Sequence, residues 1–359
     1  MGATVTTTTV TNIEQTGWRL SASYTGASSE PAEVGFLYGT SSSSLTKTIT
    51  CNNYSGTASS FSADVVGLSA GTTYYVQSYV VVDDQTFTGS VTSFKTVAAQ
   101  VPAVSGKSWL ELPGAVSGSD CVVNTYYGSS TTDANRNYTH CYDKSTYTSL
   151  WTAYHLNSSH MGSLDRPDSW SYSPSIDQSY QVDLRSSSYD DSYSRGHMIP
   201  NASRNGNETM QLQTFYVTNS VPQIQNNFNG GVWQNLEAAL QSIAKSEEIY
   251  IVTGVAFNKV GESKPVTYTT AKNDTKSVPV PNYFYKVVLK VNKSGSTVTG
   301  ASAIGFWFEH KTYSDSYTNY AVSVDKIESW TGFDFFVNLP DTVEAEAESN
   351  AEWSTFQSF

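Results

Sequence analysis

The first 96 residues of this 359-residue chain alternate apolar and polar side chains in short segments, and this period argues against helices there. Clusters of Ser, Gly, Asp and Asn separate the segments, as turn residues separate strands. The expected strands cover residues 18–24, 33–38, 60–66, 73–82 and 93–96. Short, evenly spaced strands of this kind predict an antiparallel β-sandwich.

Residues 68–76, Leu-Ser-Ala-Gly-Thr-Thr-Tyr-Tyr-Val, are followed by Ser-Phe-Lys-Thr at 93–96, and together they resemble the closing strands of a fibronectin type III domain. This resemblance implies a fold and no chemistry. A short segment with one Pro and no periodicity follows, which is typical of a linker. We therefore expect a fibronectin III-like sandwich at 1–97, a linker at 98–107 and a second domain at 108–359, in line with a length that exceeds one ordinary core.

The second part of the chain mixes strand-like and helical patterns. Trp233, Leu236, Leu240 and Ile243 recur at three- and four-residue steps, which predicts an amphipathic helix ending near Ser246. The segments that read as strands are 138–142, 150–156, 249–255, 283–291, 297–308 and 320–324. The prediction is an α+β domain with a central antiparallel or mixed sheet.

The overall charge limits how the chain can meet nucleic acid. The formal net charge is -12 and the pI is about 4.8, so binding by bulk electrostatic attraction is excluded and any phosphate site must be local. Charged residues make up 14% of the chain and aromatic residues 13%, which is typical of extracellular β-rich proteins. No apolar run reaches about 18 residues, so no membrane span is expected. The Thr-rich start after Met1 is what we expect behind a removed leader, so a secreted, periplasmic or cell-surface location is predicted.

Three cysteines are present, so at most one intramolecular disulfide can form. Cys121 and Cys141 both fall in the second domain and are the favoured pair. Three reduced thiols are the open alternative. No pair has the CxxC spacing of a structural zinc site.

Three sequence blocks carry the chemistry of the second domain. They are Ser-Arg-Gly-His-Met-Ile-Pro-Asn-Ala at 194–202, Thr-Phe-Tyr-Val-Thr-Asn-Ser-Val-Pro-Gln at 214–223, and Phe-Asn-Gly-Gly-Val-Trp-Gln-Asn-Leu-Glu at 228–237. In order and spacing they resemble the DNA/RNA non-specific endonucleases, the ββα-metal (His-Me finger) nucleases, whose pattern is Asp-Arg-Gly-His, Asn-x-x-Pro-Gln and Asn-x-x-x-Trp-x-x-Leu-Glu. Residues 150–154, 250–254 and 278–288 extend the resemblance. It implies a Mg²⁺- or Mn²⁺-dependent endonuclease acting on DNA and RNA.

Hydrolysis of a phosphodiester needs a base to deprotonate water and a cation to stabilise the charge growing on the phosphoryl oxygens. His197 has the pKa range of such a base, and the resemblance assigns it this role. The imidazole is expected to be oriented by a backbone or Asn acceptor, for which Asn219 is the candidate. The remaining histidines, His140, His155, His160 and His310, are interpreted as structural or exposed.

The metal ligand implied by the resemblance is Asn229, whose neutral oxygen suits Mg²⁺. The stretch before it is one residue longer than the common spacing, so Asn229 is assigned by its distance to Trp233 and Asn227 is the alternative. Glu237 lies eight residues beyond Asn229, about 12 Å along a continuous helix. Its expected role is therefore a water-mediated contact with the ion.

Three arginines are candidates for phosphate contact. Arg195 lies two residues before His197, so both would share one face of a strand. A guanidinium fork matches phosphoryl oxygens and stays charged. Arg166 resembles a second substrate-contacting Arg of the family, and Arg204 is a further candidate that could instead support a strand end.

The family pattern begins with Asp where this chain has Ser194, which removes a carboxylate beside the site. Two alternatives to the endonuclease hypothesis therefore remain open at this point. One is a nuclease-fold protein without turnover that binds glycans or proteins, and the other is a phosphodiesterase of small nucleotides. The sandwich is expected to tether the enzyme to a cell surface or an extracellular polymer.

Overall fold

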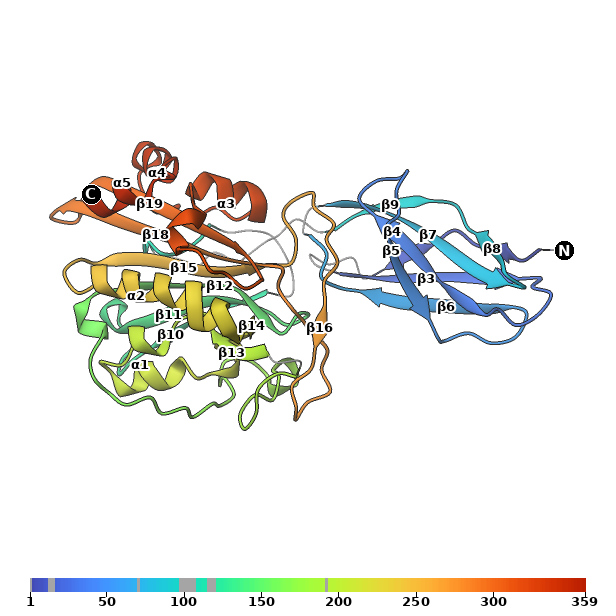
Figure 1. The fold of residues 1–359 in the computed structure, drawn as a ribbon, viewed down its shortest axis with the longest axis horizontal. Coiled ribbons are helices and arrows are strands. Elements are labelled where there is room, and N and C mark those ends of the chain that lie inside the picture. Colours follow the sequence, from blue (N-terminus) through green and yellow to red (C-terminus); the bar gives the residue numbers. More distant parts are fainter. Residues whose placement is uncertain (1, 12–16, 70–71, 97–107, 115–120, 191–192) are drawn as a thin grey trace. The chain divides into compact units, whose positions relative to one another are not determined.

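The computed structural model describes residues 2–11, 17–69, 72–96, 108–114, 121–190 and 193–359. These residues form two compact units. The first contains strands β1 to β9 together with Asn258–Pro265, and the second contains the other elements (Figure 1). The linker predicted at 98–107 lies outside the described residues.

The first unit consists of two antiparallel sheets. In one, β3 (Trp18–Thr25) pairs with β1 (Thr4–Val5), β2 (Thr9–Thr11) and β6 (Ser59–Val65). In the other the order is β5 (Lys47–Cys51), β4 (Glu33–Gly39), β7 (Thr73–Val82) and β8 (Gln85–Thr88), with β9 (Thr92–Lys95) also on β7. Alternating residues of both sheets, among them Leu20, Phe36 and Val76, are fully buried in one core. The all-β prediction is confirmed, while the closer likeness to fibronectin III stays a prediction.

The second unit is built on one antiparallel sheet of seven strands. The order is β10 (Cys121–Tyr127), β11 (Arg136–Asp143), β12 (Thr148–Leu156), β15 (Ile249–Ala256), β18 (Tyr283–Ser294), β19 (Thr297–Glu309) and β20 (Ala321–Val322). β15 is buried along its whole length because it lies mid-sheet with both faces covered. The α+β prediction with a central antiparallel sheet is confirmed.

Strand alternation gives this sheet two different faces. On β15, Ile249 and Ile251 belong to one core and Tyr250 and Val252 to the other, as successive side chains point to opposite sides. The first core is closed by Leu236 of α2 (Gln234–Ile243). We call this side of the sheet the α2 face.

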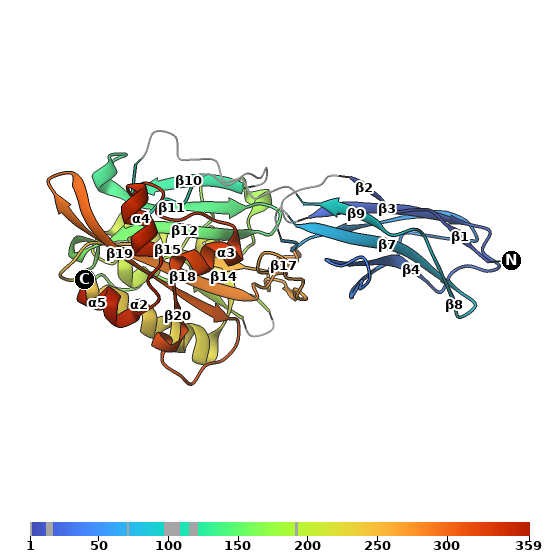
Figure 2. The same cartoon turned by 90° about the horizontal axis from the view of Figure 1, so that it is seen from above.

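The opposite side is covered by elements from the C-terminal part of the chain, and we call it the α3 face. Helices α3 (Val324–Thr331) and α4 (Asp341–Glu348) pack on β19 and bury Ile327 and Ala347 in the second core (Figure 2). The remaining elements are α1 (Glu208–Gln213), α5 (Trp353–Ser358) and two small antiparallel pairs, β13 (Tyr193–His197) with β14 (Ser220–Ile224) and β16 (Tyr268–Thr269) with β17 (Val278–Pro279).

The favoured disulfide between Cys121 and Cys141 is not formed, which leaves the open alternative of three thiols. None of the three cysteines, all of which lie in the described ranges, forms a disulfide. On the paired strands β10 and β11, Cys141 lies opposite Val123 and Cys121 lies opposite Asp143. The two thiols are therefore diagonal neighbours, with Cα atoms about 7–8 Å apart, whereas a disulfide usually joins Cα atoms about 4.4–6.8 Å apart.

None of the described helices is both long and apolar enough to cross a membrane.

Candidate active site

A pocket of about 560 Å³ opens at the α2 face. Its walls come from β13, from the segments before and after it, and from α2 with the irregular helical turns η6 (Gln225–Trp233) that precede it. His197, Arg195, Asn229, Glu237 and Arg166 all line it. The fold thus brings five of the seven predicted site residues into one cavity.

The two-stranded pair β13–β14 fixes the backbone of this site. Arg195 pairs with Pro222 and His197 with Ser220, so the two functional residues share a face as the i, i+2 spacing predicted. Gly196 between them packs directly against the Gln223 side chain, leaving no room for a Cβ atom. The motif glycine therefore permits a close approach of the two strands.

The His197 ring is enclosed by aromatic side chains. Its centroid is 4.8 Å from the Trp170 ring and 5.1 Å from the Phe215 ring. Nε2 is buried and has no hydrogen-bond partner among the described residues. Burial, with the nearby charges of Arg166 and Arg195, lowers the pKa of His197 to about 3. The imidazole is thus a neutral base beside the pocket, and a buried nitrogen of this kind is typical of a functional group.

The predicted contact between Asn219 and the imidazole is wrong. Asn219 is fully buried and its amide bonds backbone groups instead, accepting from Ile199 N (3.0 Å) and donating to Ile199 O (3.0 Å) and Thr214 O (2.8 Å). It thereby holds the chain that leaves β13 directly after His197. A backbone contact of the imidazole with Arg195, the other acceptor type considered, opposes the lowering of the His197 pKa.

Asn229 is oriented by its amide nitrogen. Nδ2 donates to Ser194 Oγ (3.1 Å) and to Gln225 Oε1 (3.0 Å), so Oδ1 keeps both lone pairs for a ligand. Ser194 Oγ in turn donates to Gln223 O (3.0 Å), which fixes the hydroxyl on β14. The residue that replaces the family's Asp therefore positions the predicted metal ligand. The alternative ligand Asn227 has a left-handed backbone (φ 60°) and does not line the pocket.

Glu237 occupies the first turn of α2 and lines the pocket. The helix begins at Gln234, and non-helical residues at 226, 227, 230 and 231 interrupt the chain before it, so the separation expected for one continuous helix does not apply. Glu237 Oε1 lies 3.5 Å from Nζ of Lys286, whose side chain is completely buried. Lys286 also donates to Thr253 Oγ1 (2.7 Å) and lies over the Trp233 ring.

The Lys286–Glu237 pair is held in a low-dielectric environment. Burial lowers the pKa of Lys286 to about 8 and raises the pKa of Glu237, while the attraction between the two groups opposes both shifts. Lys286 was missed by the sequence analysis. Its signal was a single charge inside an otherwise apolar strand, which requires a buried partner.

Two arginines approach the pocket from the side opposite α2. Arg195 donates to Leu184 O (2.9 Å) and lies over the Trp170 ring with its guanidinium carbon 4.7 Å from the centroid. Arg166 lies over the Phe215 ring (5.0 Å) and its side chain is 53% exposed. Trp170 therefore contacts both Arg195 and His197, a role that the sequence analysis missed because its surrounding loop has no motif.

The prediction that Arg204 contacts substrate is wrong. Its side chain is fully buried and donates to Asn137 Oδ1 (2.6 Å), Asn137 O (2.7 Å) and His155 O (2.9 Å). A guanidinium whose donors are used in this way cannot reach a phosphate. Arg204 ties the loop after β13 to strands β11 and β12, because only a long side chain with five donors can satisfy those backbone carbonyls.

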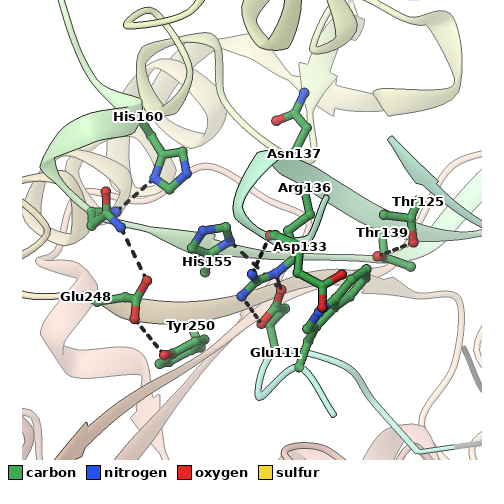
Figure 3. A network of polar contacts seen from close by, with 12 residues as sticks. Glu111, Thr125, Asp133, Arg136, Asn137, Thr139, His155, His160, Glu248 and Tyr250 are labelled. Atoms are coloured by element: carbon green, nitrogen blue, oxygen red, sulfur yellow. Dashed lines mark hydrogen bonds and ion pairs between the residues drawn. The ribbon is translucent and has the colours of Figure 1, made fainter. Parts of the chain in front are cut away.

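The other histidines are structural, as the sequence analysis predicted. His160 Nδ1 accepts from Asn157 N (3.2 Å), and His155 lies beside the ion pair of Arg136 with Glu111 (Figure 3). His140 is buried between Tyr126 and Ser149. His310 accepts from Ile224 N (2.8 Å). None of the four lines the pocket.

Comparison with known proteins agrees with this site. The family model of the DNA/RNA non-specific endonucleases matches residues 119–342. A nuclease of Nostoc sp. is 31% identical over 218 residues, which cover 59% of this chain and 75% of that protein. The mitochondrial nuclease 1 of Schizosaccharomyces pombe is 30% identical over 46% of this chain and 52% of its own length. The human mitochondrial nuclease EXOG is 28% identical over 56% of this chain and 55% of its own length.

The fold comparison points the same way. The solved structure of the EndoG/EndoGI complex, described as showing the mechanism of EndoG inhibition, contains a chain similar to this one with a TM-score of 0.51 and 20% identity. The match covers 63% of this chain and 91% of that chain. The chain belongs to the DNA/RNA non-specific endonuclease family.

Proposed function

We propose that the chain is a secreted, Mg²⁺-dependent endonuclease that hydrolyses DNA and RNA with little sequence preference. The observation that carries this proposal is the convergence, in one pocket, of a neutral imidazole, an amide oxygen and two arginines. Among the described residues, neither His197 Nε2 nor Asn229 Oδ1 is in a hydrogen bond. A base, a neutral oxygen ligand and cationic groups are what phosphodiester hydrolysis requires.

The residues fit a hydrated Mg²⁺ ion. Asn229 Oδ1 would bind it directly, and Glu237 would hold one of its water molecules, because Mg²⁺ keeps several waters and takes few protein ligands. When bound, the ion supplies positive charge next to the phosphoryl oxygens. Mn²⁺, with a similar preference for oxygen, is expected to replace it.

Side chains of the protein would carry out the proton transfer and bind the phosphate. His197 Nε2 accepts the proton of the attacking water, and packing on Trp170 and Phe215 holds the ring in place. Arg195 and Arg166 donate to phosphate oxygens. Arg195 and Arg166 are assigned to phosphate oxygens, and phosphate contacts alone carry no sequence information, which supports nonspecific cleavage.

The test is cleavage of plasmid DNA and of RNA by the purified chain with Mg²⁺ or Mn²⁺. We expect both polymers to be degraded and EDTA to stop the reaction. Intact polymers would contradict the proposal and favour the binding-protein alternative. Faster turnover of a small chromogenic diester than of long DNA would favour the small-phosphodiester alternative. Secretion is tested by fractionating the source cells. Recovery of the protein from the cytoplasm would contradict it.

A further inference from the structure

The α3 face of the sheet carries a group of carboxylates that the nuclease pocket does not use. Asp325 and Glu328 lie on α3, and Glu348 is the last residue of α4. One carboxylate oxygen from each lies within 4.8 Å of the others. We call these three residues the α3–α4 carboxylate cluster.

Glu348 is the least expected member of this cluster. It is only 4% exposed, and its Oε1 is buried without a hydrogen-bond partner in the part of the chain that the structure describes. Its carboxylate also lies at the C-terminal end of α4, where the helix dipole is negative. Burial and the neighbouring carboxylates raise the pKa of this carboxyl to about 9, so it stays protonated unless a cation lies beside it.

The described residues place no such charge beside the cluster. Asp325 and Glu328 are three residues apart on α3 and so lie on one helix face, where like charges repel. Asp334 and Glu344 add further negative potential at Glu348. Among the described residues, no Lys, Arg or His forms an ion pair with any of these five acids.

A helix cap, a hydrogen bond and core packing nevertheless fix the positions of the residues in the cluster. Ser323 caps α3 by accepting from Lys326 N, which fixes the helical turn that carries Asp325 and Glu328. Glu328 Oε1 accepts from Phe335 N (2.7 Å), so this carboxylate is held toward the segment that connects α3 to α4. Ala347, next to Glu348, is anchored in the core of the α3 face.

We propose that Asp325, Glu328 and Glu348 bind a calcium ion that joins α3 to α4. Calcium takes six to eight oxygens at about 2.3–2.6 Å, so oxygens on its opposite sides are about 4.6–5.2 Å apart. One ion can therefore contact all three carboxylates at the observed spacing. Magnesium prefers one or two carboxylates and several waters at about 2.0–2.1 Å, and it suits three converging carboxylates less well.

The site is separate from the nuclease pocket, because the seven-stranded sheet lies between the two cores. The bound ion would therefore stabilise the packing of α3 and α4 on β19 and take no part in hydrolysis. Calcium binding and nuclease activity can accordingly be tested one without the other.

The experiment uses the full chain carrying Asn229→Ala, so that ions do not bind at the pocket ligand. After treatment with EDTA and desalting, calcium is titrated by calorimetry, and thermal unfolding is measured at each concentration. We expect one calcium ion per chain and an unfolding midpoint that rises with the logarithm of calcium concentration. Adding Glu348→Gln should lower the calcium affinity by at least about tenfold.

The matched control is Glu346→Gln, which removes the same charge from an exposed position of α4 and should leave calcium binding unchanged. Without calcium, Glu348→Gln should melt close to the parent, because Gln has nearly the shape of the protonated acid that a pKa of about 9 implies. If it fails to fold, Asp325→Asn at an exposed position provides the second test and should weaken binding in the same way. Absence of calcium binding, equal binding by the Glu348 and Glu346 variants, or equal stabilisation by magnesium would overturn the proposal.

Discussion

On the α2 face of the sheet the buried charged groups have protein partners, whereas on the α3 face a buried carboxylate oxygen has none among the described residues. On the α2 face, Lys286 lies beside Glu237 and donates to Thr253, and the buried Arg204 uses its donors on backbone carbonyls. On the α3 face, Glu348 is just as buried but its Oε1 has no partner in the described part of the chain.

This difference indicates which groups on each face are available to bind a substrate or an ion. The charged groups beside the nuclease pocket have protein partners, and among the described residues neither His197 Nε2 nor Asn229 Oδ1 is in a hydrogen bond, so both are open to substrate and ion. No described basic residue pairs with the α3–α4 carboxylate cluster, so Glu348 is either protonated or bound to a cation. Four predictions test this contrast on the α2 face, and they follow in order of expected effect.

The largest effect is expected for His197→Ala. Removing the general base should lower kcat/KM for plasmid DNA by about 10²- to 10⁴-fold. The unfolding midpoint should fall by only about a few degrees, because the variant loses the ring's packing on Trp170 and Phe215 but no hydrogen bond of Nε2. Initial rates and thermal unfolding measure the two quantities. If the variant is instead largely unfolded at the assay temperature, the loss of activity reports a loss of folding. His197 is then a structural residue, and the contrast between the two faces does not hold.

Lys286→Met should affect both stability and activity. It leaves Glu237 buried without its counter-charge, and breaking a buried pair costs about 3–5 kcal/mol. Denaturant unfolding measures the loss. The matched double variant with Glu237→Gln should recover part of the stability but not the activity, because it removes the carboxylate that lines the pocket. No change in stability would show that the pair is not coupled in solution.

The pH dependence of kcat/KM tests the environment of His197. Because its pKa is lowered to about 3, the imidazole stays neutral and able to accept a proton well below its ordinary pKa. We therefore expect kcat/KM to change by less than about twofold between pH 7 and pH 5, whereas a base with a pKa of about 6.5 would lose about 30-fold. Initial rates at constant ionic strength measure this. An acid limb near pH 6.5 would show that the ring is solvated in the working enzyme.

Ser194→Ala is expected to have the smallest effect of the three substitutions. The variant removes the acceptor of Asn229 Nδ2 at 3.1 Å and leaves Gln225 as the only support of that amide. The activity should fall by about tenfold, and the Mg²⁺ concentration needed for half-maximal rate should rise. Ser188→Ala, at another serine that lines the pocket, is the control and should leave the Mg²⁺ requirement unchanged. If both variants need the same Mg²⁺ as the parent, Ser194 does not position the ligand.

Much of the fold could be predicted because local patterns carry it. β15, β18 and β19 were predicted within a few residues of their ends, since long apolar strands in a sheet covered on both faces give strong signals. The helices α3 and α4 were missed, because each has only eight residues and two turns give too weak a period. β13 and β14 lack an alternating apolar pattern, so only the motif of site residues pointed to these two segments.

The sequence by itself determined that His197, Arg195, Asn229 and Glu237 belong to one site, because the spacing of motif residues is a linear property. Only the tertiary structure decided what the individual side chains do. Arg204 and Asn219 have residue types suited to phosphate and imidazole contacts, yet both serve backbone groups that distant strands and loops bring to them. Lys286 reaches Glu237, and Glu348 joins Asp325 and Glu328, through packing across about 20 to 50 residues of intervening chain, which no local pattern records.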